Sequence, residues 1–133
     1  MNVLVIAEAG VNHNGDLGLA EELVKVASAT GADLVKFQTF SADQLVTRQA
    51  PLAGYQAGSG ESDHYEMIQR LELTRADHEY LVAACEQQGI GFFSTAFDAE
   101  SVTMLAELGQ RRFKVPSGEI DNLPLLSHIG SYG

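Results

Sequence analysis

Four short apolar runs in this chain each end in polar side chains whose types suit anion binding and acid–base chemistry. The polar residues are Glu8, Asn12 and His13 after the first run, Lys36 and Gln38 after the second, Ser94 and Thr95 after the third, and Lys114, Ser117 and Glu119 after the fourth. Parallel strands that end in reactive groups bring those groups together at one end of a sheet. The pattern therefore indicates an α/β enzyme with its site at the strand ends.

Lys36 and Lys114 carry more information than ordinary surface lysines. The chain has 8 Lys and Arg residues against 18 Asp and Glu residues, and a formal net charge of −10. Each of the two lysines lies at the end of an apolar run, where a long cation is usually a poor choice. Two solvated lysines at a rim are one interpretation. The nearby hydroxyls of Thr95 and Ser117 favour the other, a pair of ammonium groups that bind phosphate or carboxylate.

Glu8 and Glu119 are the candidates for a general acid or base. Both lie beside glycine at the ends of apolar runs, where a carboxyl group can take up or release a proton at a bound substrate. For Glu119 the alternative is strong, since a carboxylate near a helix N-terminus needs no chemistry to explain it.

The histidines do not show the spacing of a metal site. His13 lies in a turn-like segment closed by Asn14 and Gly15, and it is either a turn residue or a substrate contact. We expect His78 and His128, which lie in helical patterns, to be exposed on the surface.

Alternating elements must position these residues. We expect strands at about 3–8, 33–38, 90–95 and 111–116, and helices at about 17–30, 63–70, 75–88, 99–108 and 123–130. The expected helix caps are Asp16, Asp98, Asn122 and a capping box of Thr74 and Asp77, with Gly31, Gly89 and Gly109 directly before strands. This order predicts a parallel sheet with helices outside it, and four βα units are half of an eight-stranded barrel.

Composition excludes several functional classes. No apolar run approaches the ~20 residues of a membrane helix, and neither GxGxxG nor a P-loop motif follows a strand. The acidic charge disfavours nucleic acid and anionic membranes as partners. Cys85 is the one cysteine, so no internal disulfide forms, and we expect a plain buried thiol in a cytoplasmic protein.

Four segments carry a family resemblance: Ala7–Gly15, Val35–Thr39, Phe93–Asp98 and Phe113–Glu119. In this order and spacing they resemble the N-acetylneuraminate (sialic acid) synthase family, which includes the legionaminic and pseudaminic acid synthases. The catalytic domain of that family is a (β/α)8 TIM barrel. The resemblance implies that residues 1–133 are the N-terminal half of such a domain, a single partial domain with about the first four βα units.

The resemblance also implies an activity. The family condenses phosphoenolpyruvate with an N-acylated amino sugar, such as N-acetylmannosamine, and water to give a nonulosonic acid and phosphate. This is a transferase reaction of carbohydrate biosynthesis. A divalent metal, Mn²⁺ or Mg²⁺, is expected to assist in the full-length enzyme, with ligands that are not in this chain. A cytoplasmic homo-oligomer without nucleic acid or membrane partners is expected.

The resemblance assigns roles residue by residue. Glu8, Glu119 and Lys114 are the catalytic set, with Glu119 as the acid or base near the carbons of phosphoenolpyruvate. The phosphoenolpyruvate contacts are Lys36, Thr95, Lys114 and Ser117, the sugar contacts are Glu8 and Gln38, and the residues that line the site are Phe97, Asn12, His13 and Tyr55. A long polar loop at about 40–63, which contains Tyr55, is expected to act as a lid or binding loop and to help select the sugar.

Two alternatives stay open. One is another phosphoenolpyruvate-dependent aldol-type synthase that uses a phosphorylated sugar, and the other is a truncated binding or assembly module without turnover. A half-barrel leaves the first and fourth strands as open edges and exposes an apolar inner face. We therefore expect either a fragment of a longer enzyme or self-association, and no synthase activity from the isolated chain.

Overall fold

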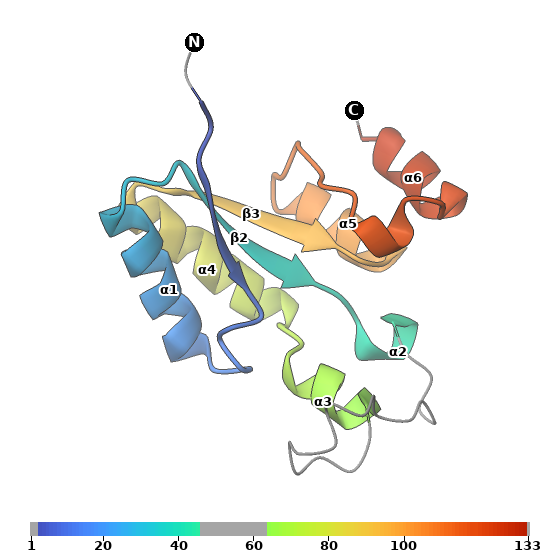
Figure 1. Cartoon of the computed structure of the whole chain (residues 1–133), viewed down its shortest axis with the longest axis horizontal. Helices are drawn as coiled ribbons and strands as arrows, with labels where there is room; N and C mark the ends of the chain where they lie inside the picture. The colour runs from blue at the N-terminus through green and yellow to red at the C-terminus, as the bar shows by residue number, and fades with distance from the viewer. Residues whose placement is uncertain (1–2, 46–63, 133) are drawn as a thin grey trace.

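A computed structural model describes residues 3–45 and 64–132 of the chain. Three strands and six α-helices follow one another along the described residues (Figure 1). The elements are β1 (Ile6–Gly10), α1 (Leu17–Ala29), β2 (Leu34–Thr39), α2 (Ala42–Leu45), α3 (His64–Arg70), α4 (Arg75–Gln88), β3 (Gly91–Ala96), α5 (Ala99–Glu107) and α6 (Leu123–Gly130), with a 3-10 turn at Ser117–Glu119. All strand pairs are parallel, in the order β1-β2-β3, which confirms the α/β class.

The strand register separates two faces of the sheet. Lys36 pairs with Glu8 on β1 and with Phe93 on β3, and Gln38 pairs with Thr95. Successive side chains of a strand point to opposite faces, so Lys36 and Gln38 share one face while Phe37 lies on the other. Figure 1 shows α1 and α4 side by side along the sheet, and their buried residues form one core cluster with Val35 and Phe37.

The helices begin and end where local sequence signals predicted. Asp16 caps α1, Asp98 caps α5 and Asn122 caps α6, each by accepting a backbone N–H three residues on. Thr74 and Asp77 form the complete capping box at the start of α4. Gly89 ends α4 in the left-handed conformation that glycine favours. These predictions are confirmed because each cap depends on a few neighbouring residues.

The predicted fourth strand is wrong. Residues 110–116 form no strand in the structure, and the side-chain amide of Gln110 occupies the edge of β3 instead. It accepts from the Ser94 N–H at 2.8 Å and donates to the Ser94 carbonyl at 2.9 Å. Arg111, Arg112 and Lys114 make this segment too charged to pack as a buried strand on β3 alone. Among the described residues, β1 and β3 are therefore the edge strands of the sheet.

The histidines of the helices are less exposed than predicted. His78 is fully buried, so the prediction of a surface residue is wrong, because it lies on the same face of α4 as Leu81 and Cys85. His128 is half-buried and shares a hydrogen bond of 2.9 Å with Thr103. Cys85 is buried as predicted, and burial raises the pKa of its thiol to about 11. Within the described ranges, no helix has the length and apolar character of a membrane span.

Candidate active site

Lys36 is the centre of the candidate site. Its side chain is 7% exposed, and its ammonium lies 2.5 Å from Glu8 Oε2 and 3.2 Å from Thr95 Oγ1. The three side chains come from β1, β2 and β3, which the register places side by side. A buried ammonium requires a counter-charge and hydrogen-bond acceptors. The Glu8 carboxylate supplies the charge, and its own side chain stays 52% exposed, so it is the movable partner of the pair.

A bulge in β1 brings further polar groups to this centre. The pairing of β1 with β2 shifts between Glu8 and Gly10, and Gly10 adopts φ +57°, which favours glycine. A Cβ at Gly10 would lie 3.3 Å from Glu8 Oε1, 3.7 Å from Gln38 Nε2 and 3.9 Å from Asn12 Nδ2. The structure therefore brings Glu8, Asn12 and Gln38 together beside Lys36.

Phe97 and Glu119 line a neighbouring cavity of about 470 Å³, between the end of β3, α2 and the start of α6. Glu119 Oε2 accepts a hydrogen bond of 2.6 Å from the Asn122 amide. Asn122 also caps α6, because its Oδ1 accepts from the Leu125 N–H at 3.2 Å. One side chain thus fixes both the helix start and the carboxylate, a positioning role that the sequence analysis did not assign to Asn122.

Lys114 and Ser117 form no hydrogen bond or ion pair with the Lys36 centre among the described residues. Both are exposed, and no side-chain hydrogen bond or ion pair joins either of them to another residue within 3–45 or 64–132. Their segment does not pair with β3, so the structure does not align Lys114 with Lys36 across neighbouring strands. Their phosphoenolpyruvate contacts stay predictions, as does the role of Tyr55, which falls outside the described residues.

Among the predicted site residues that the structure describes, His13 lies on the helix-covered face of the sheet, against Phe37. It is fully buried, and its ring packs 6.2 Å from the ring of Phe37. Its Nδ1 accepts from the Gly15 N–H at 3.0 Å, so the imidazole closes the turn, which is one of the two roles left open by the sequence. Burial lowers the pKa of His13, and His78 nearby lowers it further. The structure supports the turn role and does not bring the ring to Lys36.

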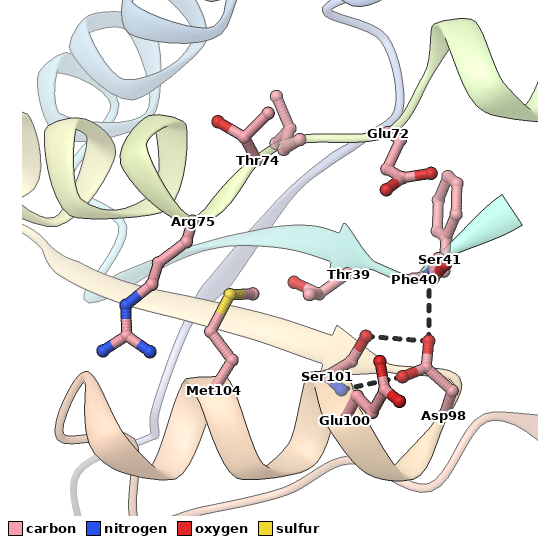
Figure 2. Close-up of a pocket in the computed structure, with 11 residues that line it drawn as sticks. Thr39, Phe40, Ser41, Glu72, Thr74, Arg75, Asp98, Glu100, Ser101 and Met104 are labelled. Carbon is pink, nitrogen blue, oxygen red and sulfur yellow. Dashed lines mark hydrogen bonds between the residues drawn. The ribbon is translucent and has the colours of Figure 1, made fainter. Parts of the chain in front are cut away.

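A second cavity, of about 250 Å³, lies where β2 ends and α4 and α5 begin (Figure 2). Two of its carboxylates, those of Asp98 and Glu72, hold the chain through hydrogen bonds. Asp98 accepts from the Ser41 N–H at 2.9 Å and from the Ser101 hydroxyl at 2.8 Å, the contacts drawn in Figure 2. Glu72 accepts from the Ala42 N–H at 3.0 Å. The carboxylates that line this cavity therefore hold the segment after β2 in place, Asp98 from the start of α5 and Glu72 from the segment before α4.

The described residues do not fit a metal on their own. Within 3–45 and 64–132, no three His, Cys, Asp or Glu side chains gather around a point where an ion would bind.

Comparison with known proteins identifies the family. The NeuB family model matches residues 23–133. The chain is 51% identical over 133 residues to N,N'-diacetyllegionaminic acid synthase of Legionella pneumophila, covering 98% of this chain and 37% of that protein. The same enzyme of Campylobacter jejuni is 49% identical over 128 residues, covering 95% of this chain and 38% of that protein.

A solved structure extends the likeness to the fold. The crystal structure of the N-acetylneuraminic acid synthetase of Leptospira borgpetersenii superposes with a TM-score of 0.84 at 28% identity, covering 99% of this chain and 42% of that one. The fold is accordingly part of a TIM-type barrel, of which the described residues form three parallel strands and their helices. The chain spans less than two fifths of the length of these two curated relatives. With the family model matched over 23–133, the chain belongs to the NeuB family.

Proposed function

We propose that this chain supplies the phosphoenolpyruvate-binding part of a nonulosonic acid synthase, an enzyme that condenses phosphoenolpyruvate with an N-acylated amino sugar and water. The observation that carries the proposal is the buried Lys36 ammonium held between Glu8 and Thr95 at the ends of adjoining strands. The relatives named as legionaminic acid synthases support the class of product.

The Lys36 centre suits an exchange of anions. Phosphoenolpyruvate carries a carboxylate and a phosphate, and either group satisfies a buried ammonium at least as well as Glu8 does. Thr95 Oγ1, at 3.2 Å from the ammonium, donates its hydroxyl proton to the same anion. When the anion replaces Glu8 at Lys36, the Glu8 carboxylate and the adjoining Gln38 amide become available to the hydroxyls of the sugar.

The reaction then forms one carbon–carbon bond and needs one carboxyl group as a general base. Carbon 3 of phosphoenolpyruvate attacks the aldehyde carbon of the sugar, and the aldehyde oxygen takes up a proton. Positive charge develops at carbon 2, and water adds there with loss of a proton to a base. Glu119, held by Asn122 at 2.6 Å, is the proposed base. The tetrahedral intermediate then breaks its bond to the phosphate oxygen and releases inorganic phosphate.

Calorimetric titration with phosphoenolpyruvate tests the binding step. We expect the Lys36→Ala variant to lose binding by a factor of ~100 or more, because a charge-assisted contact in a buried site is removed. The matched control is Lys25→Ala, since in the described part of the chain Lys25 pairs with Glu21 and Glu22 on the exposed side of α1. Equal affinity of the two variants, or no binding by the unaltered chain, contradicts the proposal.

A further inference from the structure

A buried hydrogen-bonded network of His78, Thr39 and Ser94 lies directly behind the candidate site, on the helix-covered face of the sheet. His78 Nδ1 lies 2.8 Å from the Thr74 carbonyl, and His78 Nε2 lies 2.7 Å from Thr39 Oγ1. Thr39 Oγ1 lies 2.6 Å from Ser94 Oγ. Thr39 is 2% exposed, while His78 and Ser94 are fully buried. This network thus joins the start of α4 to the ends of β2 and β3.

Each hydrogen bond of this network has a defined donor and acceptor. The Thr74 carbonyl can only accept, so His78 Nδ1 carries the hydrogen. Burial lowers the pKa of His78, which keeps the ring neutral and leaves Nε2 as an acceptor. Thr39 therefore donates to His78, and Ser94 donates to Thr39. Each of the three side chains has a definite role that no apolar residue reproduces.

The network holds the ends of the two strands that carry Gln38 and Thr95. Thr39 follows Gln38 on β2 and Ser94 precedes Thr95 on β3, and Gln38 pairs with Thr95 in the register. The backbone of Ser94 is also held at both its N–H and its carbonyl by the Gln110 amide. Side chains of neighbouring positions point to opposite faces. Fixing Thr39 and Ser94 from behind therefore fixes the directions of Gln38 and Thr95 in front.

We propose that His78 is a positioning residue, which through Thr39 and Ser94 holds Gln38 and Thr95 in the geometry that binds substrate at Lys36. This inference rests on the proposed function. Stability alone does not require this network, because apolar residues of similar shape at the same three buried positions give comparable or greater stability. A fully satisfied buried network instead specifies one arrangement of the strands it joins.

Two substitutions separate positioning from simple burial. His78→Gln keeps an acceptor that reaches Thr39, whereas His78→Asn keeps a donor for the Thr74 carbonyl and loses the contact with Thr39. Both remove the ring from its place against Phe92, where the ring centroids lie 6.1 Å apart, so both are expected to lower the melting temperature. Thr39→Val, which keeps the shape and removes the hydroxyl, serves as the third variant if His78→Asn does not fold.

Calorimetric titration with phosphoenolpyruvate gives the first readout. We expect His78→Asn and Thr39→Val to weaken binding about tenfold, and His78→Gln to stay within about threefold of the unaltered chain. A merely structural role predicts equal affinity in all folded variants, and that result overturns the inference.

Amide hydrogen exchange gives a second readout that needs no ligand. We expect the Gln38 and Thr95 amides to exchange faster in His78→Asn and Thr39→Val than in His78→Gln. If the unaltered chain does not bind phosphoenolpyruvate, the proposed function fails, and exchange alone decides the positioning role. Equal exchange at Gln38 and Thr95 in the three variants overturns it.

Discussion

Lys36 presents the sharpest electrostatic problem at the scale of single residues. Its ammonium is buried, and Glu8 is its one charged partner in the described part of the chain. A buried charge that loses its partner is costly, whereas a half-exposed carboxylate that leaves the pair returns to water at little cost. This asymmetry makes Glu8 a stand-in anion that substrate displaces.

Replacing Glu8 tests this competition directly. In Glu8→Gln the charge of Lys36 is no longer satisfied by the protein, so we expect unfolding in urea to show a loss of about 1 kcal/mol, a value reduced for the exposure of Glu8. Phosphoenolpyruvate should bind severalfold more tightly, because no carboxylate competes for the ammonium. The matched control is Glu22→Gln, which breaks an exposed pair on α1 and should change stability by less than about 0.5 kcal/mol. Weaker binding by Glu8→Gln would show that Glu8 and substrate do not compete.

The two buried histidines predict how stability depends on pH. Burial lowers the pKa of both His13 and His78 in the folded chain. The unfolded chain therefore takes up protons first as the pH falls below about 6.5, and the folded state loses stability from there down to the lowered pKa values. Urea unfolding should show a slope of up to about 1.4 kcal/mol per pH unit for each histidine in that window.

The control for this pH dependence is a variant that removes one histidine. His78→Gln lacks one of the two titrating rings, so its profile should be shallower below about pH 6.5. An unchanged slope would assign the loss of stability below about pH 6.5 to groups other than His78. Carboxylates with lowered pKa values are not candidates, because they lose stability only at more acidic pH.

At the scale of elements, the turn between β1 and α1 is fixed by backbone geometry. Gly15 adopts φ +77°, and a Cβ there would lie 2.1 Å from the Arg70 carbonyl oxygen. Gly31 adopts nearly the same φ, +79°, with nothing within 4 Å of its Cβ position. The two glycines therefore separate backbone strain from close packing.

Alanine substitutions at these two glycines should differ in cost. Gly31→Ala introduces only the strain of a left-handed residue, about 1 kcal/mol. Gly15→Ala adds a clash with backbone that cannot rotate away, so we expect it to destabilise by about 3 kcal/mol or more in urea unfolding. Similar losses for the two variants would mean that the turn moves freely away from α3.

How far the sequence predicts these elements depends on the range of the interactions. The caps at Asp16, Thr74 and Asp98 were predictable because each is satisfied within one helical turn. The fourth strand was not, since strand formation depends on distant partners and the Gln110 amide takes the place of one at Ser94. The predicted grouping of Glu8, Lys36 and Thr95 followed from strand order alone.

The errors at single residues have an identifiable signal. His78 lies three residues before Leu81 and seven before Cys85, which is the spacing of one helix face. Reading that face as apolar would have placed the histidine inside, next to Thr39 and Ser94 on the covered side of the strands. Their alternation with Gln38 and Thr95 indicates opposite faces. The exposure of Lys114 had no such signal, because it follows from a strand that does not form.

At the scale of the whole molecule, apolar side chains at the first residue of β1 and in the segment just before it lie open to solvent. Val3 is 81% exposed, Leu4 47%, Val5 51% and Ile6 40%. β1 pairs on one side only among the described residues, since the sheet order is β1-β2-β3. An exposed edge strand with an apolar face is a template for pairing with another chain.

Analytical ultracentrifugation should therefore show concentration-dependent self-association of the 133-residue chain. Val5→Lys places a charge on the open edge and should shift the chain toward monomer, because edge charges oppose strand pairing. The matched control is Val26→Lys, an equally apolar and 59% exposed position on α1, which should associate as before. Since association through the β1 edge leaves the Lys36 centre on the sheet face, the Val5→Lys monomer should still bind phosphoenolpyruvate. A chain that is monomeric at all concentrations and binds no hydrophobic dye would show that the apolar edge is stable alone.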